Sequence, residues 1–581
     1  MAQLQSRSSR VKAVILLVLV VTAGLILIGA EINRNGAQAA PSKKGHGKQL
    51  RAILQRSSRH VCGTPKRGFA RCLAQITTDN IGQPLAGSPD STDSLGPVQF
   101  HTAYNLPCKP GGQVASICST PETFGPEIIA IVDAGNFSTG SSGLESSLQN
   151  YDQFYGLPAC TMANGCLSVV NQSGTTSPLP ADAGWSDEIA LDVETAHMIC
   201  QTCQIVLIEA NSTSTVDLAT ANDTAASYNP ASISNSWGSD TDVSALDSSF
   251  NHPGIAIVAS TGDSGTVSNG PAWPADNPNV IAAAGTTLQM FSDNTWAGET
   301  VWSGSGGGCS TFYSAPTWQT SLPEWGTNGC GSFRAFGDVS ADADPNTGAA
   351  VNINSTWFRI GGTSLSAPII ASIFALTGGL PGGTNGPTVP YSSFNTANSH
   401  DVTSGNDCTS THTTHCTAAS GFDTPSGLGS PNGVSGLASL PSQPVLTAKD
   451  VNQNQIDLSW TASSSSSGIK NYQLYRNGSQ IAAQTGTSYS DTSLSANTSY
   501  NYYVIANDNN GNASLASQSV SGFTAFMADI NEDAHIGLTD LNLLVSKFGQ
   551  SGSNLGRSDI DSNQTVNVFD LSLLESKYGS E

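Results

Sequence analysis

The chain has 581 residues, 38% of them hydrophobic, so it is long enough to form several domains with apolar cores. Only 11% of the residues are charged and the formal net charge is −22, which argues against nucleic acid or anionic lipid as the main partner. The acidic surface has two explanations: general solubility, or adaptation to acid, where protonated carboxylates no longer repel one another.

The N-terminal region is typical of an export signal. Basic residues precede an uncharged apolar run over residues 13–30, and a small-x-small cleavage site follows at residues 37–39. We therefore expect residues 1–39 to be the signal peptide of a secreted protein. The alternative is a cell-surface protein anchored by residues 13–30, because this run reaches the lower limit for spanning a bilayer. Residues 40–96 are then a short prosegment or a spacer.

The cysteines indicate an oxidising compartment, which agrees with export from the cell. All 12 lie before residue 420, in short local pairs that predict six disulfides, although spacing alone does not fix their connectivity. The pairs are Cys62 and Cys72, Cys108 and Cys118, Cys160 and Cys166, Cys200 and Cys203, Cys309 and Cys330, and Cys408 and Cys416. The Cys-x-x-Cys motif at residues 200–203 ends a helical pattern. This favours a structural disulfide over a redox or metal site, because redox pairs draw thiolate stabilisation from a helix start.

Residues 97–440 alternate apolar strands with helical patterns. This alternation predicts a parallel α/β sheet, since buried parallel strands are apolar throughout and are joined by helices. The expected strands are residues 128–132, 205–208, 255–258 and 280–284, and an expected helix covers residues 187–199.

The composition changes at residues 440–444, after which cysteine no longer occurs. Residues 441–525 show short strands of period two separated by turn signals, which predict a β-sandwich. The spacing of Leu494, Thr498 and Tyr500 resembles the tyrosine corner of a fibronectin type III module, with Trp460 as its core tryptophan. Another immunoglobulin-like sandwich is the alternative.

Residues 526–581 contain an internal repeat, because the pattern of residues 540–549 recurs at residues 570–579. Oxygen-bearing side chains precede each copy at the alternate positions of a calcium loop, and the seventh position offers a carbonyl. The expected ligands are Asp529, Asn531, Asp533, His535 and Asp540 in the first loop, and Asp559, Asp561, Asn563, Thr565 and Asp570 in the second.

Both loops end in Asp instead of Glu and lack Gly at the sixth position, a pattern that resembles a type I dockerin. The resemblance implies a small α-helical domain that binds two Ca²⁺ ions and docks on a cohesin-bearing scaffold. Residues 538–539 and 568–569 occupy the cohesin-contacting positions. They lack the frequent Ser-Thr pair, which leaves the identity of the partner open.

Residues 361–368, Gly-Gly-Thr-Ser-Leu-Ser-Ala-Pro, place Ser364 where an apolar helix begins. A helix N-terminus favours negative charge that develops beside it, so this serine is a candidate nucleophile. The same Gly-Thr-Ser sequence also caps ordinary helices. A subtilisin-type enzyme would need a histidine base, but none of the 9 histidines lies in a His-Gly-Thr-His context.

Carboxyl groups are the alternative to a histidine base. Glu188 and Asp192 are spaced i and i+4, so both project from one helical face, where like charges raise an apparent pKa. Their apolar neighbours indicate a buried helix rather than a solvated acidic face. A third acid, Asp263, follows the expected strand 255–258 in Ser-Thr-Gly-Asp-Ser-Gly, which by itself is a common turn.

Together these motifs resemble the sedolisin family of serine-carboxyl peptidases over roughly residues 97–440. Further matching stretches lie at residues 100–107, 234–238 and 338–345. The resemblance implies a subtilisin-like parallel-sheet α/β catalytic domain, followed here by the β-sandwich and the small α-helical calcium-binding domain. It also implies an endopeptidase that acts on protein or peptide substrates at acidic pH.

The resemblance assigns a role to each catalytic position. Ser364 is the nucleophile, Glu188 the general base and then acid, and Asp192 orients Glu188. Asp263 belongs to the oxyanion hole, where it donates a hydrogen bond only while it is protonated. This requirement is the physical reason to expect an acid optimum.

The same resemblance implies one Ca²⁺ ion near the end of the catalytic domain. Asp401 and Asp423 match its side-chain ligands, and Val402, Ala419 and Gly421 match its carbonyl ligands.

Two alternatives remain beside this interpretation. Sedolisins commonly carry a large folded prodomain, whereas here a short segment with Cys62 and Cys72 precedes the catalytic region. Either this segment suffices as inhibitor and chaperone, or the protein matures differently. A catalytically silent adhesion or scaffold protein is the rival function, and the presence of all four catalytic positions argues against it.

Overall fold

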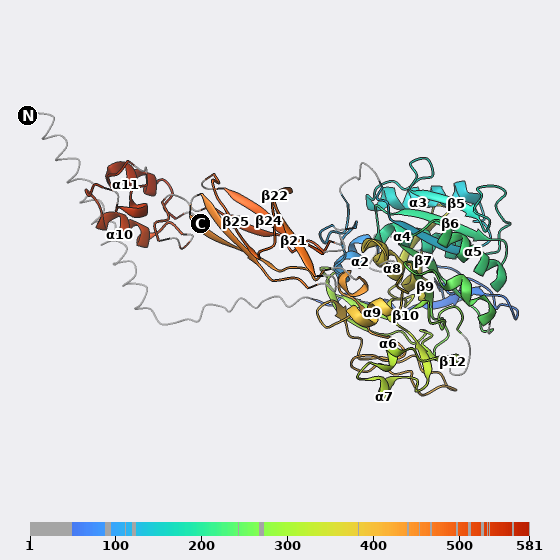
Figure 1. Cartoon of the computed structure of the whole chain (residues 1–581). Coiled ribbons are helices and arrows are strands. Elements are labelled where there is room, and N and C mark those ends of the chain that lie inside the picture. Colours follow the sequence, from blue (N-terminus) through green and yellow to red (C-terminus); the bar gives the residue numbers. More distant parts are fainter. Residues whose placement is uncertain are drawn as a thin grey trace, which may run out of the picture. The chain divides into compact units, whose positions relative to one another are not determined.

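Figure 1 shows a computed structural model of the chain. The structure describes residues 49–579 apart from 87–93, 111, 119–123, 242, 267–271, 381–382, 439–440, 453, 465–467, 496–497, 509–512, 525–527, 532, 534, 553 and 561–562. The expected signal or anchor, residues 1–39, lies outside the described residues. Within the part of the chain that is described, no helix is both long and apolar enough to cross a membrane.

The first part of the chain is built on one large sheet with the order β11-β10-β9-β7-β4-β6-β5, and β14 also pairs with β10. The strands from β5 to β10, and β14, run parallel, while β11 is antiparallel. Their bounds are Ile128–Ala134 (β4), Leu167–Asn171 (β5), Gln204–Ala210 (β6), Ser232–Asn235 (β7), Ala256–Ser260 (β9), Ile281–Met290 (β10), Trp296–Val301 (β11) and Val339–Asp342 (β14). The predicted parallel α/β sheet is therefore confirmed.

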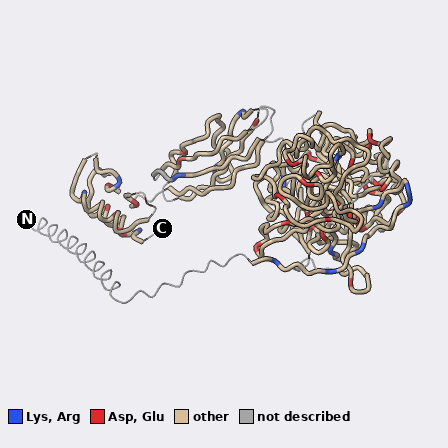
Figure 2. Tube along the Cα trace, turned by 90° about the horizontal axis from the view of Figure 1, so that it is seen from below, with Lys and Arg blue, Asp and Glu red and all other residues tan. Residues whose placement is uncertain are grey.

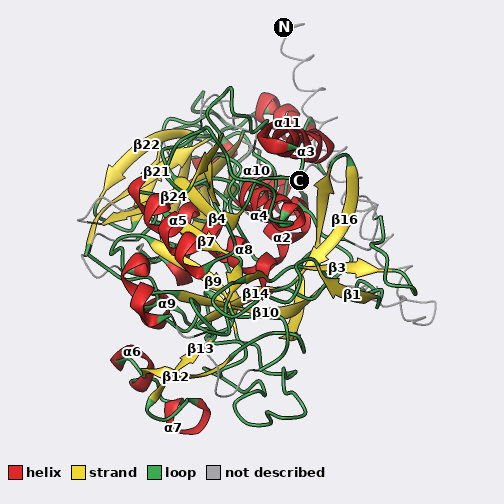
Figure 3. Cartoon of the chain, turned by 90° about the vertical axis from the view of Figure 1, so that its right-hand side faces the viewer, coloured by secondary structure: helices red, strands yellow, loops and turns green. Residues whose placement is uncertain are grey.

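Helices cover both faces of this sheet. Helices α4 (Ser186–Ile199) and α8 (Thr363–Leu376) pack on each other against one face, and α5 (Thr215–Ser227) lies on the other (Figures 1 and 3). Every residue of α8 is buried, as expected for a helix that is apolar all round. The remaining helices here are α2 (Pro97–Ala103), α3 (Gly140–Tyr155), α6 (Thr317–Thr320), α7 (Trp325–Asn328), α9 (Thr388–Ser393) and the 3₁₀ turns Ser244–Phe250 and Ser435–Leu437.

The segment that precedes residue 97 joins the α/β part of the chain through backbone pairing. Strands β1 (Ser57–His60) and β3 (Gln75–Thr78) form one sheet with β16 (Thr356–Gly361) and β15 (Ala349–Ile353), in the order β1-β3-β16-β15. The short strand β2 (Arg71–Cys72) pairs with β8 (Trp237–Gly238). Smaller pairings join β12 (Gly308–Ser314) to β13 (Phe333–Phe336) and β17 (Ser399–His400) to β18 (Ser430–Pro431).

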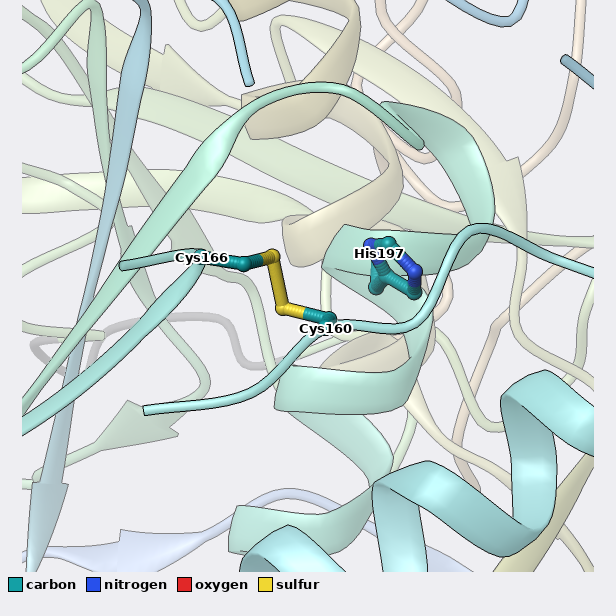
Figure 4. A group of neighbouring side chains, drawn as sticks. All are labelled: Cys160, Cys166 and His197. Atoms are coloured by element: carbon teal, nitrogen blue, oxygen red, sulfur yellow. A yellow bond between two sulfur atoms is a disulfide. The ribbon is translucent and has the colours of Figure 1, made fainter. Parts of the chain in front are cut away.

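All six predicted cysteine pairs form disulfides, including the Cys-x-x-Cys pair at the end of α4. One of them, Cys160–Cys166, lies beside the buried His197 (Figure 4). The His197 Nε2 lies 2.8 Å from the Pro158 carbonyl oxygen and 3.3 Å from Asp152 Oδ1. Because the sulfurs are bonded to each other, this group is structural and not a metal site.

The next part of the chain is a β-sandwich. One sheet contains β19 (Leu446–Asn452), β20 (Gln455–Trp460) and β23 (Ser488–Asp491), and the other contains β21 (Ile469–Arg476), β22 (Ser479–Gln484), β24 (Ser499–Asp508) and β25 (Val520–Phe523). Trp460 and Tyr502 are among the side chains that fill the core between the sheets. The hydroxyl of Tyr500 accepts a hydrogen bond of 3.1 Å from the Ser495 N–H, as in a tyrosine corner.

The C-terminal repeat forms helices α10 (Leu538–Ser546) and α11 (Val568–Glu575), with a 3₁₀ turn at Gly556–Ser558 between them (Figure 1). The two helices contact each other. Each begins with a capping box in which an aspartate of the first turn, Asp540 or Asp570, bonds back to the backbone of the preceding cap residue. The sequence repeat is thus also a structural repeat.

Candidate active site

Ser364 lies in the first turn of α8, two residues after a glycine that the geometry requires. Gly362 has φ +96°, a conformation that residues with a Cβ rarely adopt, and a Cβ there would lie 2.6 Å from Asp263 Oδ2. The Ser364 side chain is buried, and its hydroxyl donates a hydrogen bond of 3.1 Å to the carbonyl oxygen of Ser236. The Gly-Gly-Thr-Ser sequence therefore places a serine hydroxyl at a helix N-terminus inside the protein.

Glu188 and Asp192 lie one turn apart on α4, and both side chains are fully buried. The Ser236 hydroxyl donates to Asp192 Oδ1 at 2.9 Å. Burial raises the pKa of Glu188, and the nearby Ser364 hydroxyl opposes this shift in part. The structure thus brings together the two acids and the serine that the sequence predicts.

Burial is the main influence on the protonation of both acids. It raises the pKa of Glu188 well above its usual range, and repulsion from Asp192 and Asp133 raises it further. Burial and Asp133 also raise the pKa of Asp192 well above its usual range, while the Ser236 hydroxyl opposes the shift. The two carboxyl groups are therefore placed to share and exchange protons rather than to carry two full charges.

Asp263 follows β9 and faces the start of α8. Its Oδ1 accepts hydrogen bonds of 2.8 Å from both the N–H and the hydroxyl of Thr363, whereas Oδ2 is buried without a hydrogen-bond partner. Burial raises its pKa to about 7, against the lowering influence of Thr363 and Arg71. Below that pH Asp263 is protonated, and its free oxygen can carry the proton that an oxyanion needs.

Asp133 and Glu209 complete the acidic cluster, and neither was predicted from the sequence. They end neighbouring parallel strands, where Asp133 on β4 pairs with Glu209 on β6. Burial raises the pKa of Asp133 to about 7 and that of Glu209 to about 8, with Asp133 adding to the second shift. A carboxylate that ends a buried apolar strand was the available signal, because binding sites of α/β sheets gather at the carboxyl ends of strands.

The five expected ligands of the catalytic-domain Ca²⁺ ion lie in two neighbouring loops. Asp401 Oδ2 accepts a hydrogen bond of 3.0 Å from the Gly421 N–H, and Asp423 Oδ2 accepts one of 2.7 Å from the Ala419 N–H. Burial, and to a lesser extent Asp401, raises the pKa of Asp423 to about 7. Val402 directly follows Asp401. A set of carboxylate and carbonyl oxygens of this kind suits Ca²⁺.

In the first C-terminal loop, carboxylate oxygens of Asp529, Asp533 and Asp540 all lie within 4.8 Å of one another. Asp540 Oδ2 accepts from the Gly537 N–H at 2.9 Å, and Asn531 Nδ2 donates to Asp533 Oδ2 at 2.6 Å. Asp533 Oδ1 also accepts from the N–H of His535, the expected carbonyl ligand, at 2.9 Å. The oxygen-only donor set fits a hard cation.

The second loop follows the same pattern over the residues that the structure describes. Asp559 Oδ1 accepts from the Asn563 N–H at 3.0 Å, Asn563 Oδ1 accepts from the Thr565 N–H at 2.9 Å, and Asp570 Oδ2 accepts from the Asn567 N–H at 2.8 Å. The remaining expected ligand, Asp561, lies outside the described residues.

Part of the chain is similar to known peptidases. The chain is 31% identical to kumamolisin of Bacillus sp. (strain MN-32) over 48% of this chain and 54% of that protein. It is 35% identical to xanthomonalisin of Xanthomonas sp. (strain T-22) over 26% of this chain and 20% of that protein, and 37% identical to sedolisin of Pseudomonas sp. (strain 101) over 23% and 24%. These relatives are serine-carboxyl peptidases.

The chain resembles the sedolisin family. The matches span about half the length of kumamolisin and a quarter or less of xanthomonalisin and sedolisin. Residues 441–523 match the fibronectin type III domain family. The family resemblance that the motifs indicated is therefore confirmed for the peptidase-like and fibronectin type III parts of the chain.

Proposed function

We propose that the protein is a serine-carboxyl endopeptidase that hydrolyses peptide bonds of proteins in acid and is exported from the cell. The observation that carries the proposal is the cluster of Ser364, Glu188, Asp192 and Asp263. These residues come from helices α4 and α8 and from the turn after β9, and they lie buried at the carboxyl edge of one parallel sheet. The six disulfides support an oxidising destination.

In this mechanism Glu188 takes the proton of Ser364 as its oxygen attacks a substrate carbonyl, and later gives that proton to the leaving amine. Asp192 accepts a hydrogen bond from the Ser236 hydroxyl. It orients Glu188 and shares a proton with it. Protonated Asp263 stabilises the oxyanion. Because the pKa of Asp263 is about 7, the donor is present in acid and is lost as the pH rises through that value.

The accessory parts add calcium and attachment to this proposal. One Ca²⁺ ion would be held by the loops that contain Asp401 and Asp423, where it would stabilise the catalytic domain. The two C-terminal loops would hold two more and present helices α10 and α11 to a cohesin-bearing scaffold. Supporting this surface, Leu538 is 41% exposed and Phe569 67% exposed.

The decisive experiment measures cleavage of an unfolded protein substrate from about pH 3 to about pH 9. Wild-type protein should be active in acid, and Ser364→Ala and Glu188→Gln should lower the rate by at least about 10⁴-fold. Two matched controls change residues on the same helices. Ser366→Ala removes a hydroxyl that donates to the Ala284 carbonyl oxygen, and Glu194→Gln replaces a carboxylate that accepts from the Asn352 N–H. Activity that survives Ser364→Ala, or that peaks above about pH 8, would refute the proposal.

A further inference from the structure

A segment of the chain itself lies in the candidate active site. Strand β2 pairs antiparallel with β8, so that Arg71 faces Gly238 and Cys72 faces Trp237. The next residue, Leu73, donates a hydrogen bond of 3.1 Å from its N–H to the Ser236 carbonyl oxygen, the atom that also accepts from the Ser364 hydroxyl. An extended peptide added to a strand edge in this manner is a common mode of peptide recognition.

The peptide bond between Leu73 and Ala74 spans the catalytic groups. At one end, the Leu73 carbonyl oxygen accepts a hydrogen bond of 3.3 Å from the Ser364 N–H. It also faces Gly362 Cα, as Asp263 Oδ2 does, since a Cβ on that glycine would collide with both oxygens. At the other end, the Ala74 N–H donates to Glu188 Oε2 at 3.1 Å. The carbonyl oxygen thus lies in the oxyanion site and the amide nitrogen lies beside the general acid.

Contacts on both sides of this bond keep it in place. Before the bond, Arg71 Nη2 donates to Ser264 Oγ at 3.0 Å. After it, Gln75 Nε2 donates to the Asp263 carbonyl oxygen at 3.2 Å, and β3 pairs with β16 directly before the nucleophile. Arg71 and Leu73 also line the pocket formed by the Asp263 turn. Residues 71–76 therefore run past the catalytic groups, as a bound substrate would.

We propose that the Leu73–Ala74 bond is the enzyme's own cleavage site, and that the cut segment stays bound as an inhibitor. The inference rests on the proposed peptidase function and names the first substrate of that site. Cleavage does not free the segment, because β1 lies before the bond and β3 after it, and the two strands pair from Ser57↔Thr78 to His60↔Gln75. In addition, the Cys62–Cys72 disulfide ties the residue before Leu73 to the end of β1.

The reaction is ordinary hydrolysis and needs only water. Ser364 Oγ bonds to the Leu73 carbonyl carbon while its proton passes to Glu188. The bond to the Ala74 nitrogen then breaks, and the amine takes the proton from Glu188. Water attacks the resulting ester, gives one proton to Glu188 and releases the Leu73 carboxylic acid, after which Ser364 recovers its proton. The new amine stays beside the ester, so resealing competes with release.

The test follows the N-termini of the full-length protein during incubation at about pH 4. Sequencing and mass spectrometry should detect a new chain that begins at Ala74, at a rate independent of protein concentration, and none in Ser364→Ala. Under native conditions, the fragment that ends at Leu73 should remain associated with the enzyme. An intact Leu73–Ala74 bond, a terminus elsewhere, or a rate that rises with protein concentration would overturn the inference.

Release is tested with the double variant Cys62→Ser/Cys72→Ser, assayed on an added unfolded protein. It should be at least about tenfold more active than wild type at early times, because the cut segment dissociates faster. The matched control is Cys408→Ser/Cys416→Ser, which removes a disulfide of another loop and should not increase activity. The Ala74 terminus of the wild type decides the matter if the double variant does not fold.

The same assays separate this inference from the proposed function. If the wild type degrades the added protein in a Ser364-dependent manner but never acquires an Ala74 terminus, the inference fails and the peptidase function stands. If neither the added protein nor the Leu73–Ala74 bond is cut by the wild type or the double variant, both fail.

Discussion

Two groups of acidic side chains, those of the candidate active site and those of the proposed C-terminal calcium loops, differ in what shifts their pKa values. At the active site, Glu188, Asp192 and Asp263 are buried, and burial is the first cause that raises the pKa of each. In the first C-terminal loop Asp529 and Asp540 are also buried, but Asp533 is exposed, and hydrogen bonds from Asn531 and from the His535 N–H lower its pKa. Desolvation favours the neutral acid, whereas hydrogen-bond donors in water favour the carboxylate. The first group is therefore suited to moving protons, and the second to attracting a cation.

This contrast also explains the acidic balance of the chain, with 44 acidic and 22 basic residues. Acidic positions are distributed along the described trace, and Lys and Arg are few (Figure 2). Buried carboxyls with so few basic neighbours are neutral in acid and costly in their charged form at higher pH. Such a composition therefore agrees with the proposed activity in acid.

Substitutions of Asp263 test the first group through the size and the pH dependence of the activity that is lost. Asp263→Ala should lower kcat/KM by about 10²- to 10³-fold, because the oxyanion loses its side-chain donor. Asp263→Asn keeps an N–H donor at every pH, so it should lower kcat/KM less than Asp263→Ala does. In this variant kcat/KM should also fall less than in the wild type as the pH rises through about 7. The measurement is the pH profile of kcat/KM.

Asp276→Asn is the matched control for this profile. Asp276 is also buried, with a pKa raised to about 6, but it bonds to Ser310 outside the cluster. Its variant should keep the wild-type profile. An unchanged profile in Asp263→Asn would show that another group causes the loss of activity at higher pH.

The predictable parts of this site are those that local spacing encodes. Glu188 and Asp192 follow from an i, i+4 pair in an apolar helix, and Ser364 follows from a glycine-rich helix start. The cysteine pairs form within short loops, so their spacing predicted the bonds. The strands themselves were recognisable as apolar runs, but their order β10-β9-β7-β4-β6-β5 is not the chain order.

The features that were missed depend on that order. Asp133 and Glu209 become neighbours only because β4 and β6 pair in one register. The position of Leu73 depends on the pairing of β2 with β8 and of β3 with β16, which are far apart in sequence. Residues 71–76 have no local pattern that indicates an active-site ligand, so the sequence left their region as a prosegment or a spacer. Long-range backbone pairing supplied the missing information.

The proposed calcium loops test the second group. Calorimetric titration of the full-length protein should show three Ca²⁺ sites, and Asp540→Ala and Asp570→Ala should each weaken one of them by about 10- to 100-fold. Asp401→Ala should weaken the site in the catalytic domain instead. Since carboxylates must be ionised to bind, affinity should fall as the pH falls towards about 4.

Asp457→Ala, on strand β20 of the sandwich, is the control that removes an acid outside these loops and should leave all three sites intact. If Asp540→Ala and Asp570→Ala both bind calcium as the wild type does, the C-terminal acids are only a solvated surface.

The pH dependence of stability should differ between the two groups. In the folded protein the pKa of Asp133 and Asp263 is about 7 and that of Glu209 about 8, all above their unfolded values. A raised pKa gives stability that is complete below the unfolded value and is lost as the pH rises through the folded one. With calcium chelated, the Tm of the peptidase part should therefore fall by roughly 5 °C between about pH 4 and about pH 8.

This measurement uses Ser364→Ala, so that self-cleavage does not interfere. Adding Asp133→Asn, which cannot ionise, should flatten the decline. A Tm that instead rises over this range would mean that the buried acids are charged and paired in the folded state.

The smallest effect on stability is expected at the exposed face of the C-terminal helices. Phe569 is 67% exposed at the start of α11, so Phe569→Ala should change the free energy of unfolding by no more than about 0.5 kcal/mol. Val216→Ala is the control, because Val216 is 59% exposed on α5 of the peptidase part. If the face around Phe569 docks on a cohesin, Phe569→Ala should weaken calcium-dependent binding by at least about tenfold, while Val216→Ala leaves it unchanged. Equal binding by both variants would leave the calcium loops with a structural role and no part in docking.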